Sequence, residues 1–103
     1  MTKPGLQKWI QILQERDPQF AEMYLEMREQ VLKDGAIPAK YKILMTLIAD
    51  AIAAHPDGCA GIANRARAAG ATEAEINEAV EVAFMYGGTP ALNTAVNAFR
   101  TEM

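Results

Sequence analysis

The length of this chain, 103 residues and 11.2 kDa, predicts a single domain over residues 1–103. Half of the residues are hydrophobic but only 7% are aromatic, so the core must come mainly from Ala, Leu, Ile, Val and Met. The net charge of −3, with no segment rich in Lys or Arg, argues against a nucleic-acid partner, since binding there requires a basic face. No apolar run reaches the roughly 20 residues that span a membrane, and Met1–Gly5 does not have the pattern of a signal peptide. The single cysteine excludes an internal disulfide. We therefore expect a cytoplasmic protein with no membrane partner.

Two helices are predicted in the N-terminal third of the chain. Apolar residues at positions i, i+3, i+4 and i+7 predict the first helix from about Leu6 to Arg16. Asp17 followed by Pro18 is a strong start for the second, with Asp as the N-cap and Pro in the first turn. This helix is expected to end at Gly35, as a glycine beyond the C-cap.

The third and fourth helices are predicted on either side of a polar break. The third, about residues 39–54, carries a broad apolar stripe and is expected to be the most buried helix. His55-Pro56-Asp57-Gly58 then interrupts the pattern. The fourth helix, about residues 59–69, ends at Gly70.

The C-terminal part predicts two more helices and completes an all-α fold. Thr72 and Glu75 have the spacing of a capping box at the start of the fifth helix. Gly87-Gly88 forms the next break, and Thr89-Pro90 repeats the N-cap and first-turn signature before the last helix. We therefore expect a bundle of about six helices without strands. Its Ala-rich helices, with few aromatic residues, favour burial between copies in a homo-oligomer.

The stretch from residue 42 to residue 99 resembles the carboxymuconolactone decarboxylase and alkylhydroperoxidase D family. The likeness rests on the string Gly-Ala-Thr-Glu-Ala-Glu-Ile-Asn-Glu-Ala, residues 70–79, and on the Gly-Gly-Thr-Pro break, residues 87–90. The resemblance implies a helical bundle that assembles into trimers or hexamers. It also implies peroxiredoxin-type antioxidant activity, an oxidoreductase function.

The residues of the family's thiol mechanism are missing, however. From the resemblance we would expect the motif of the family's peroxidases, Cys-x-x-Cys-x-x-x-His, at the start of the fourth helix and a Glu on the helix before it. Counted back without gaps from Gly70, the two thiol positions fall on His55 and Gly58, the His on Ile62 and the Glu on Ile43. The chain is therefore expected to be a divergent member that lacks the two-thiol mechanism.

Cys59 and His55 are the candidate catalytic residues. Cys59 lies near a helix N-terminus, where the helix dipole favours a thiolate, although Asp57 opposes it; the alternative is a small, partly buried apolar residue. His55 is the single histidine, so it is the candidate base; the alternative is a cation near the end of the third helix.

Other polar residues give weaker signals. His55, Asp57 and Cys59 lack a fourth ligand and match no zinc spacing, so we expect no metal and no cofactor. The glutamates of the fifth helix are expected to form a solvated face, and Met85 and Tyr86 to be packing residues unless a ligand meets the hydroxyl. Arg65 and Arg67 are the nearest cations that a carboxylate ligand would need.

Three functions remain open from the sequence. The first is a family member of unassigned activity, which keeps the fold for binding or for another small-molecule role. The second is a one-cysteine peroxidase or thiol-disulfide reductase that uses Cys59, with His55 as the base. The third is an enzyme similar to a decarboxylase or isomerase, acting on a small carboxylated lactone through His55 or a tyrosine.

Overall fold

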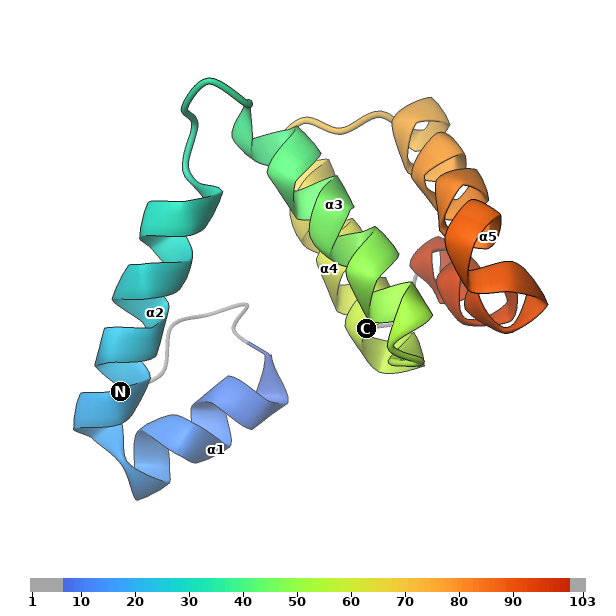
Figure 1. Ribbon diagram of the computed structural model, residues 1–103. Helices are drawn as coiled ribbons and strands as arrows, with labels where there is room; N and C mark the ends of the chain where they lie inside the picture. Colours follow the sequence, from blue (N-terminus) through green and yellow to red (C-terminus); the bar gives the residue numbers. More distant parts are fainter. Residues whose placement is uncertain (1–6, 101–103) are drawn as a thin grey trace. The chain divides into compact units, whose positions relative to one another are not determined.

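The computed structural model describes residues 7–100 and confirms the all-α fold (Figure 1). The described residues form five α-helices and a final 3₁₀ helix, with no strand among them. The chain divides into two compact units, Met1–Lys33 and Asp34–Met103. The expectation of a single domain over residues 1–103 stays a prediction. Within residues 7–100, no helix is both long and apolar enough to cross a membrane.

The first unit contains helices α1, Lys8–Arg16, and α2, Pro18–Leu32, which pack against each other. Their contact includes an edge-on pair of rings, Trp9 and Tyr24, with centroids 5.3 Å apart. The predicted start of α2 is confirmed, since the Asp17 side chain accepts a hydrogen bond from the backbone N–H of Phe20 and Pro18 lies in the first turn. Leu6, expected to start the first helix, lies outside the described residues.

The predicted glycine cap of α2 is wrong. The helix ends at Leu32, and the next residue, Lys33, has the extended backbone angles φ −68° and ψ 162°. The chain has therefore left the helix before it reaches Gly35, which does not have a positive φ. A glycine near the end of an apolar pattern is a cap only where the backbone turns left-handed at that residue.

The second unit is built around helix α3, Ala39–Ile52, which packs against α4, Pro56–Ala68, and α5, Glu73–Ala95. The 3₁₀ helix η1, Val96–Phe99, packs against α4. Alanine dominates the core, as the composition predicts, but the methionines expected there are missing from it among the described residues. The larger core side chains are Leu44, Leu47, Cys59, Ile62, Ile76 and Val80.

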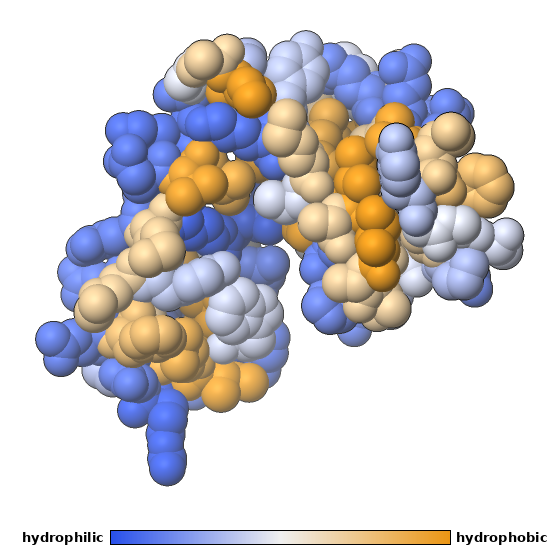
Figure 2. All heavy atoms as spheres, viewed as in Figure 1, coloured by the Kyte–Doolittle hydropathy of each residue, from blue (hydrophilic) through white to orange (hydrophobic). Residues whose placement is uncertain are grey.

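Helix α3 is not the most buried helix of the protomer. It buries three residues, whereas α4 buries five and α5 six. The outer part of its apolar stripe is exposed at Tyr41, Met45 and Ile52. Further large apolar side chains are exposed on α2, at Phe20, Met23, Met27 and Val31. Figure 2 shows hydrophobic side chains that reach the visible surface in both units. The apolar stripe on α3 is therefore only partly buried.

Helices α3 and α4 end in the same hydrogen-bonded turn. At the end of α3, the N–H groups of Ala54 and His55 donate to the carbonyls of Ala51 and Asp50, at 3.1 and 3.0 Å. At the end of α4, Gly70 and residue 71 repeat this pattern. This Schellman turn requires a left-handed residue, which is Gly70 in one case (φ 103°) and Ala54 in the other (φ 66°).

Helix α5 contains the two last helices that the sequence predicts. Its start is confirmed as a capping box, with the side chains of Thr72 and Glu75 each accepting from the other's backbone N–H. The predicted break is a kink at Gly88, which has the non-helical angles φ 70° and ψ −166°. Helical geometry resumes with Pro90 in the first turn of the second segment, so α5 consists of two helical segments on either side of this break, as the sequence predicts.

Candidate functional site

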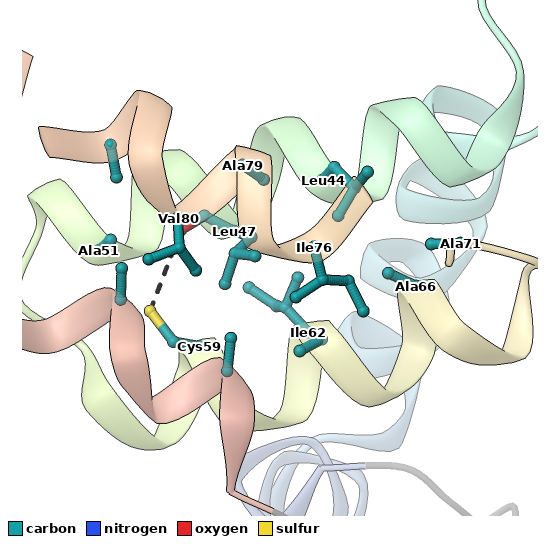
Figure 3. Close-up of a cluster of buried hydrophobic side chains, with 14 residues drawn as sticks. Leu44, Leu47, Ala51, Cys59, Ile62, Ala66, Ala71, Ile76, Ala79 and Val80 are labelled. Carbon is teal, nitrogen blue, oxygen red and sulfur yellow. Dashed lines mark hydrogen bonds between the residues drawn. The ribbon is translucent and has the colours of Figure 1, made fainter. Parts of the chain in front are cut away.

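The thiol of Cys59 lies inside the core of the second unit. The residue is 0% exposed, and its Sγ is 3.9 Å from the backbone oxygen of Leu47, on α3. Figure 3 shows the sulfur directed into the apolar cluster between α3, α4 and α5. Burial, and then the negative charge of Asp50, raises the pKa of the Cys59 thiol to about 11. The thiol is thus held in the protonated form, which is a poor nucleophile.

Ile62 and Ile43, which the gap-free count from Gly70 predicts to stand at the family's His and Glu positions, lie in the same core. Ile62 is 5% exposed, and Ile43 packs against the cluster from α3. Figure 3 shows Ile62 beside Ile76 within the apolar cluster. Neither isoleucine can relay a proton, so hydrocarbon fills the place where the thiol mechanism needs ionisable groups.

His55 lies on the surface at the turn between α3 and α4 and is paired with a carboxylate. Its Nδ1 is 2.7 Å from Oδ1 of Asp50, in the last turn of α3. The His55 side chain is 62% exposed and that of Asp50 is 24% exposed. A carboxylate only accepts hydrogen bonds, so Nδ1 donates and Nε2 is left as the acceptor of the neutral ring.

Sequence reasoning missed Asp50. Asp50 lies five residues before His55, near the end of the predicted third helix. An acidic residue in such a position is ordinarily interpreted as solvent-exposed surface. Only the left-handed turn at Ala54 brings the two side chains together. An acidic residue just before a helix end and a histidine just after it is the one signal that would have suggested the pair.

His55, Asp57 and Cys59, the three residues weighed and rejected as a metal site from the sequence, are not brought together in the structure. Asp57 pairs with Nη1 of Arg100 at 3.1 Å, and Cys59 is inside the core. Among residues 7–100, no group of three His, Cys, Asp or Glu side chains could hold a metal ion. His55 lies just beyond the end of α3, where its N–H donates to the Asp50 carbonyl, and it is also the N-cap residue of α4, without a side-chain capping bond.

The two arginines suggested as carboxylate ligands differ in their surroundings. Arg67 is occupied structurally: it binds both carboxylate oxygens of Glu73, at 2.7 and 3.0 Å, and the backbone oxygen of Ala98 at 3.0 Å. Its hydrogen bonds hold the pKa of Glu73 below the ordinary value. Arg65 keeps its Nε buried without a hydrogen-bond partner in the described structure.

The remaining candidates are surface residues. Tyr86 is 91% exposed, and Met85 next to it is also exposed, so neither is the packing residue that the sequence predicted. On α5, Glu75 binds Nζ of Lys40 at 3.2 Å. The pKa of Glu75 is held below its ordinary value, first by the hydrogen bond from the Thr72 N–H and second by the one from Lys40. Glu78 and Glu81 are exposed, in keeping with a solvated acidic face.

Comparison with known proteins identifies the family. A sequence model described as the carboxymuconolactone decarboxylase family matches residues 18–101, most of the chain. The chain therefore belongs to the carboxymuconolactone decarboxylase family. The match includes the stretch from residue 42 to residue 99 on which the resemblance rests. It also covers helix α2, which lies before that stretch. No curated protein and no solved structure matches the chain.

Proposed function

We propose that this protein is a carboxymuconolactone decarboxylase family member that works without thiol–peroxide chemistry. One observation carries the proposal: the single thiol is completely buried and its pKa is raised to about 11. A peroxidase needs an accessible thiolate at neutral pH, and a second thiol or an external one to resolve the oxidised sulfur. The buried site offers neither access nor ionisation.

Alkylation of Cys59 with iodoacetamide across pH 6–11 tests this proposal. We expect slow alkylation at neutral pH, at least tenfold slower than in the same protein unfolded in urea, where the thiol is solvated. Turnover of hydrogen peroxide with dithiothreitol is expected to equal that of Cys59→Ala. Fast alkylation at pH 7 together with turnover that Cys59→Ala abolishes would instead establish the one-cysteine peroxidase or reductase.

A second candidate function is proton transfer on a small molecule, as in a decarboxylase or isomerase that acts on a carboxylated lactone. The observation that favours it is the Asp50–His55 pair, with Nδ1 and Oδ1 2.7 Å apart on the surface. A neutral imidazole with one ring nitrogen free to accept can remove a proton made acidic by a neighbouring carbonyl. His55 would be the base.

A panel of lactones and muconate-type acids tests the second candidate. Thermal shift reports binding, and ultraviolet absorbance of the conjugated acid reports turnover. We expect at least one compound to be consumed by the wild-type protein and not by His55→Gln. Turnover that persists unchanged in His55→Gln would contradict the role of His55.

We also propose that the active form is a homo-oligomer in the cytoplasm, a trimer or hexamer. The support is the row of exposed apolar side chains on α2, where Met27 is 68% exposed, since water-soluble monomers rarely expose contiguous apolar rows. A second copy of this chain is the occupant that we propose for that row.

A further inference from the structure

We propose that Asp50 is the positioning residue of His55: its carboxylate holds the imidazole in the Nδ1–H tautomer and so presents Nε2 to a substrate as a proton acceptor. The inference rests on the proton-transfer candidate above and assigns a role to a residue that the sequence did not single out. Its substrate class is a small carbonyl compound with a proton on the neighbouring carbon. Nε2 takes that proton, and the electron pair of the broken C–H bond passes to the carbonyl oxygen as an enolate.

The polar contact itself sets the tautomer. The Nδ1–Oδ1 distance of 2.7 Å is that of a strong hydrogen bond, and an ionised carboxylate has no proton to donate. The proton therefore sits on Nδ1 in the neutral ring. The neutral ring of a solvated histidine side chain carries the proton mostly on Nε2, so the pairing with Asp50 changes which nitrogen is basic.

The backbone of the turn fixes both partners. The His55 N–H donates to the Asp50 carbonyl at 3.0 Å, so the two residues are joined by main chain as well as by side chain. Ala54 between them holds a φ of 66°, which costs a non-glycine residue roughly 1 kcal/mol. The strained residue is thus the one that folds His55 back over the last turn of α3.

The first turn of α4 leaves room for the carboxylate. A Cβ added at Gly58 would overlap Oδ2 of Asp50 and would lie 3.3 Å from the Cβ of His55. The carboxylate is therefore seated against the helix, in agreement with its lower exposure of 24%. His55 is 62% exposed, so the oriented ring faces solvent, where a small molecule can reach it.

The single histidine of the chain allows a direct test. Long-range ¹H–¹⁵N spectra of the ¹⁵N-labelled full chain, recorded at a pH at which the His55 ring is neutral, report which ring nitrogen carries the proton. We expect mostly Nδ1–H in the wild-type protein and mostly Nε2–H in Asp50→Ala. Gly58→Ala removes neither partner but displaces the carboxylate, and we expect it to shift the ring in the same direction. Asp57→Ala is the matched control, since that carboxylate pairs with Arg100, and it should keep the wild-type tautomer.

The outcomes separate this inference from the proposed function. A wild-type ring that is mostly Nε2–H, or an Nδ1–H ring that Asp50→Ala leaves unchanged, overturns the positioning role whatever the enzyme assays give. A tautomer that switches in Asp50→Ala, with Asp57→Ala unaffected, establishes it. If the tautomer switches but no carbonyl compound is turned over, the proton-transfer function fails and the positioning of His55 by Asp50 stands.

Discussion

Cys59 is packed at a point where three helices meet and where the side chain has no access to water. Its Sγ is the terminal atom of a residue that is 0% exposed, and Figure 3 shows it among aliphatic side chains. In this setting a cysteine acts as a small apolar residue. The physical consequence is that ionisation of the thiol opposes folding.

The raised pKa of Cys59 predicts a loss of stability at alkaline pH. The folded-state pKa of about 11 exceeds the value of about 8.5 for a solvated thiol, so folding favours the protonated form. That contribution is fully present below pH 8.5 and is lost as the pH rises toward 11, by about 1–2 kcal/mol at pH 10. Urea unfolding at pH 7.5 and pH 10 should show a larger decrease for the wild-type protein than for Cys59→Ala. Equal decreases in the two proteins would mean that the thiol is solvated.

At the residue scale, the sequence predicted the missing relay but not the new pair. The positions of Ile43 and Ile62 followed from a gap-free register with the family string, and a helix core then fixes their burial. Asp50 could not be found in this way, because the register of a helix says nothing about how the chain turns after its last residue. The pairing with His55 depends on the backbone angles of Ala54.

At the scale of the elements, the two Schellman turns differ in the residue that takes the left-handed conformation. Gly70 adopts φ 103° without steric cost, whereas Ala54 adopts φ 66° with its Cβ close to the following carbonyl. The same backbone geometry is therefore more favourable after α4 than after α3. The strain at Ala54 lies beside the Asp50–His55 pair.

Exchanging the residues of the two turns tests this difference. Ala54→Gly is expected to stabilise the fold by about 0.5 kcal/mol, because glycine relieves the strain by more than it adds backbone entropy to the unfolded chain. Gly70→Ala should destabilise the fold by a similar amount, about 0.5 kcal/mol, since nothing else crowds that position. The free energy of unfolding in urea measures both changes. A destabilised Ala54→Gly would show that α3 does not end in the left-handed turn.

At the scale of the whole molecule, the exposed apolar side chains are the main unexplained feature of the protomer. The row on α2 follows the spacing 3, 4 and 4, so its members lie on one helix face: Phe20, Met23, Met27 and Val31. A face of this kind is stable in water only when another surface covers it. The proposed homo-oligomer provides that surface.

A charge placed in this row should change the oligomeric state. Met27→Glu puts a carboxylate among the apolar side chains, and a charge buried without a partner costs several kcal/mol. We expect light scattering to show a lower mass than for the wild-type protein, with circular dichroism still helical. Glu22→Lys, on the opposite face of α2, is the control and should keep the wild-type mass. A wild-type protein that is already monomeric would contradict the oligomer.

The sequence alone determined the class of the fold, most of the helix starts and the absence of the family's pair of thiols. These features depend on local chemistry, such as the caps at Asp17 and Thr72, or on a fixed helical register, as for Ile43 and Ile62. The tertiary structure decided how deeply Cys59 is buried, where α2 ends and that His55 meets Asp50. The burial of Cys59 depends on three helices packing together, and the pairing of His55 with Asp50 depends on a single backbone turn. The spacing of apolar residues predicts neither of them.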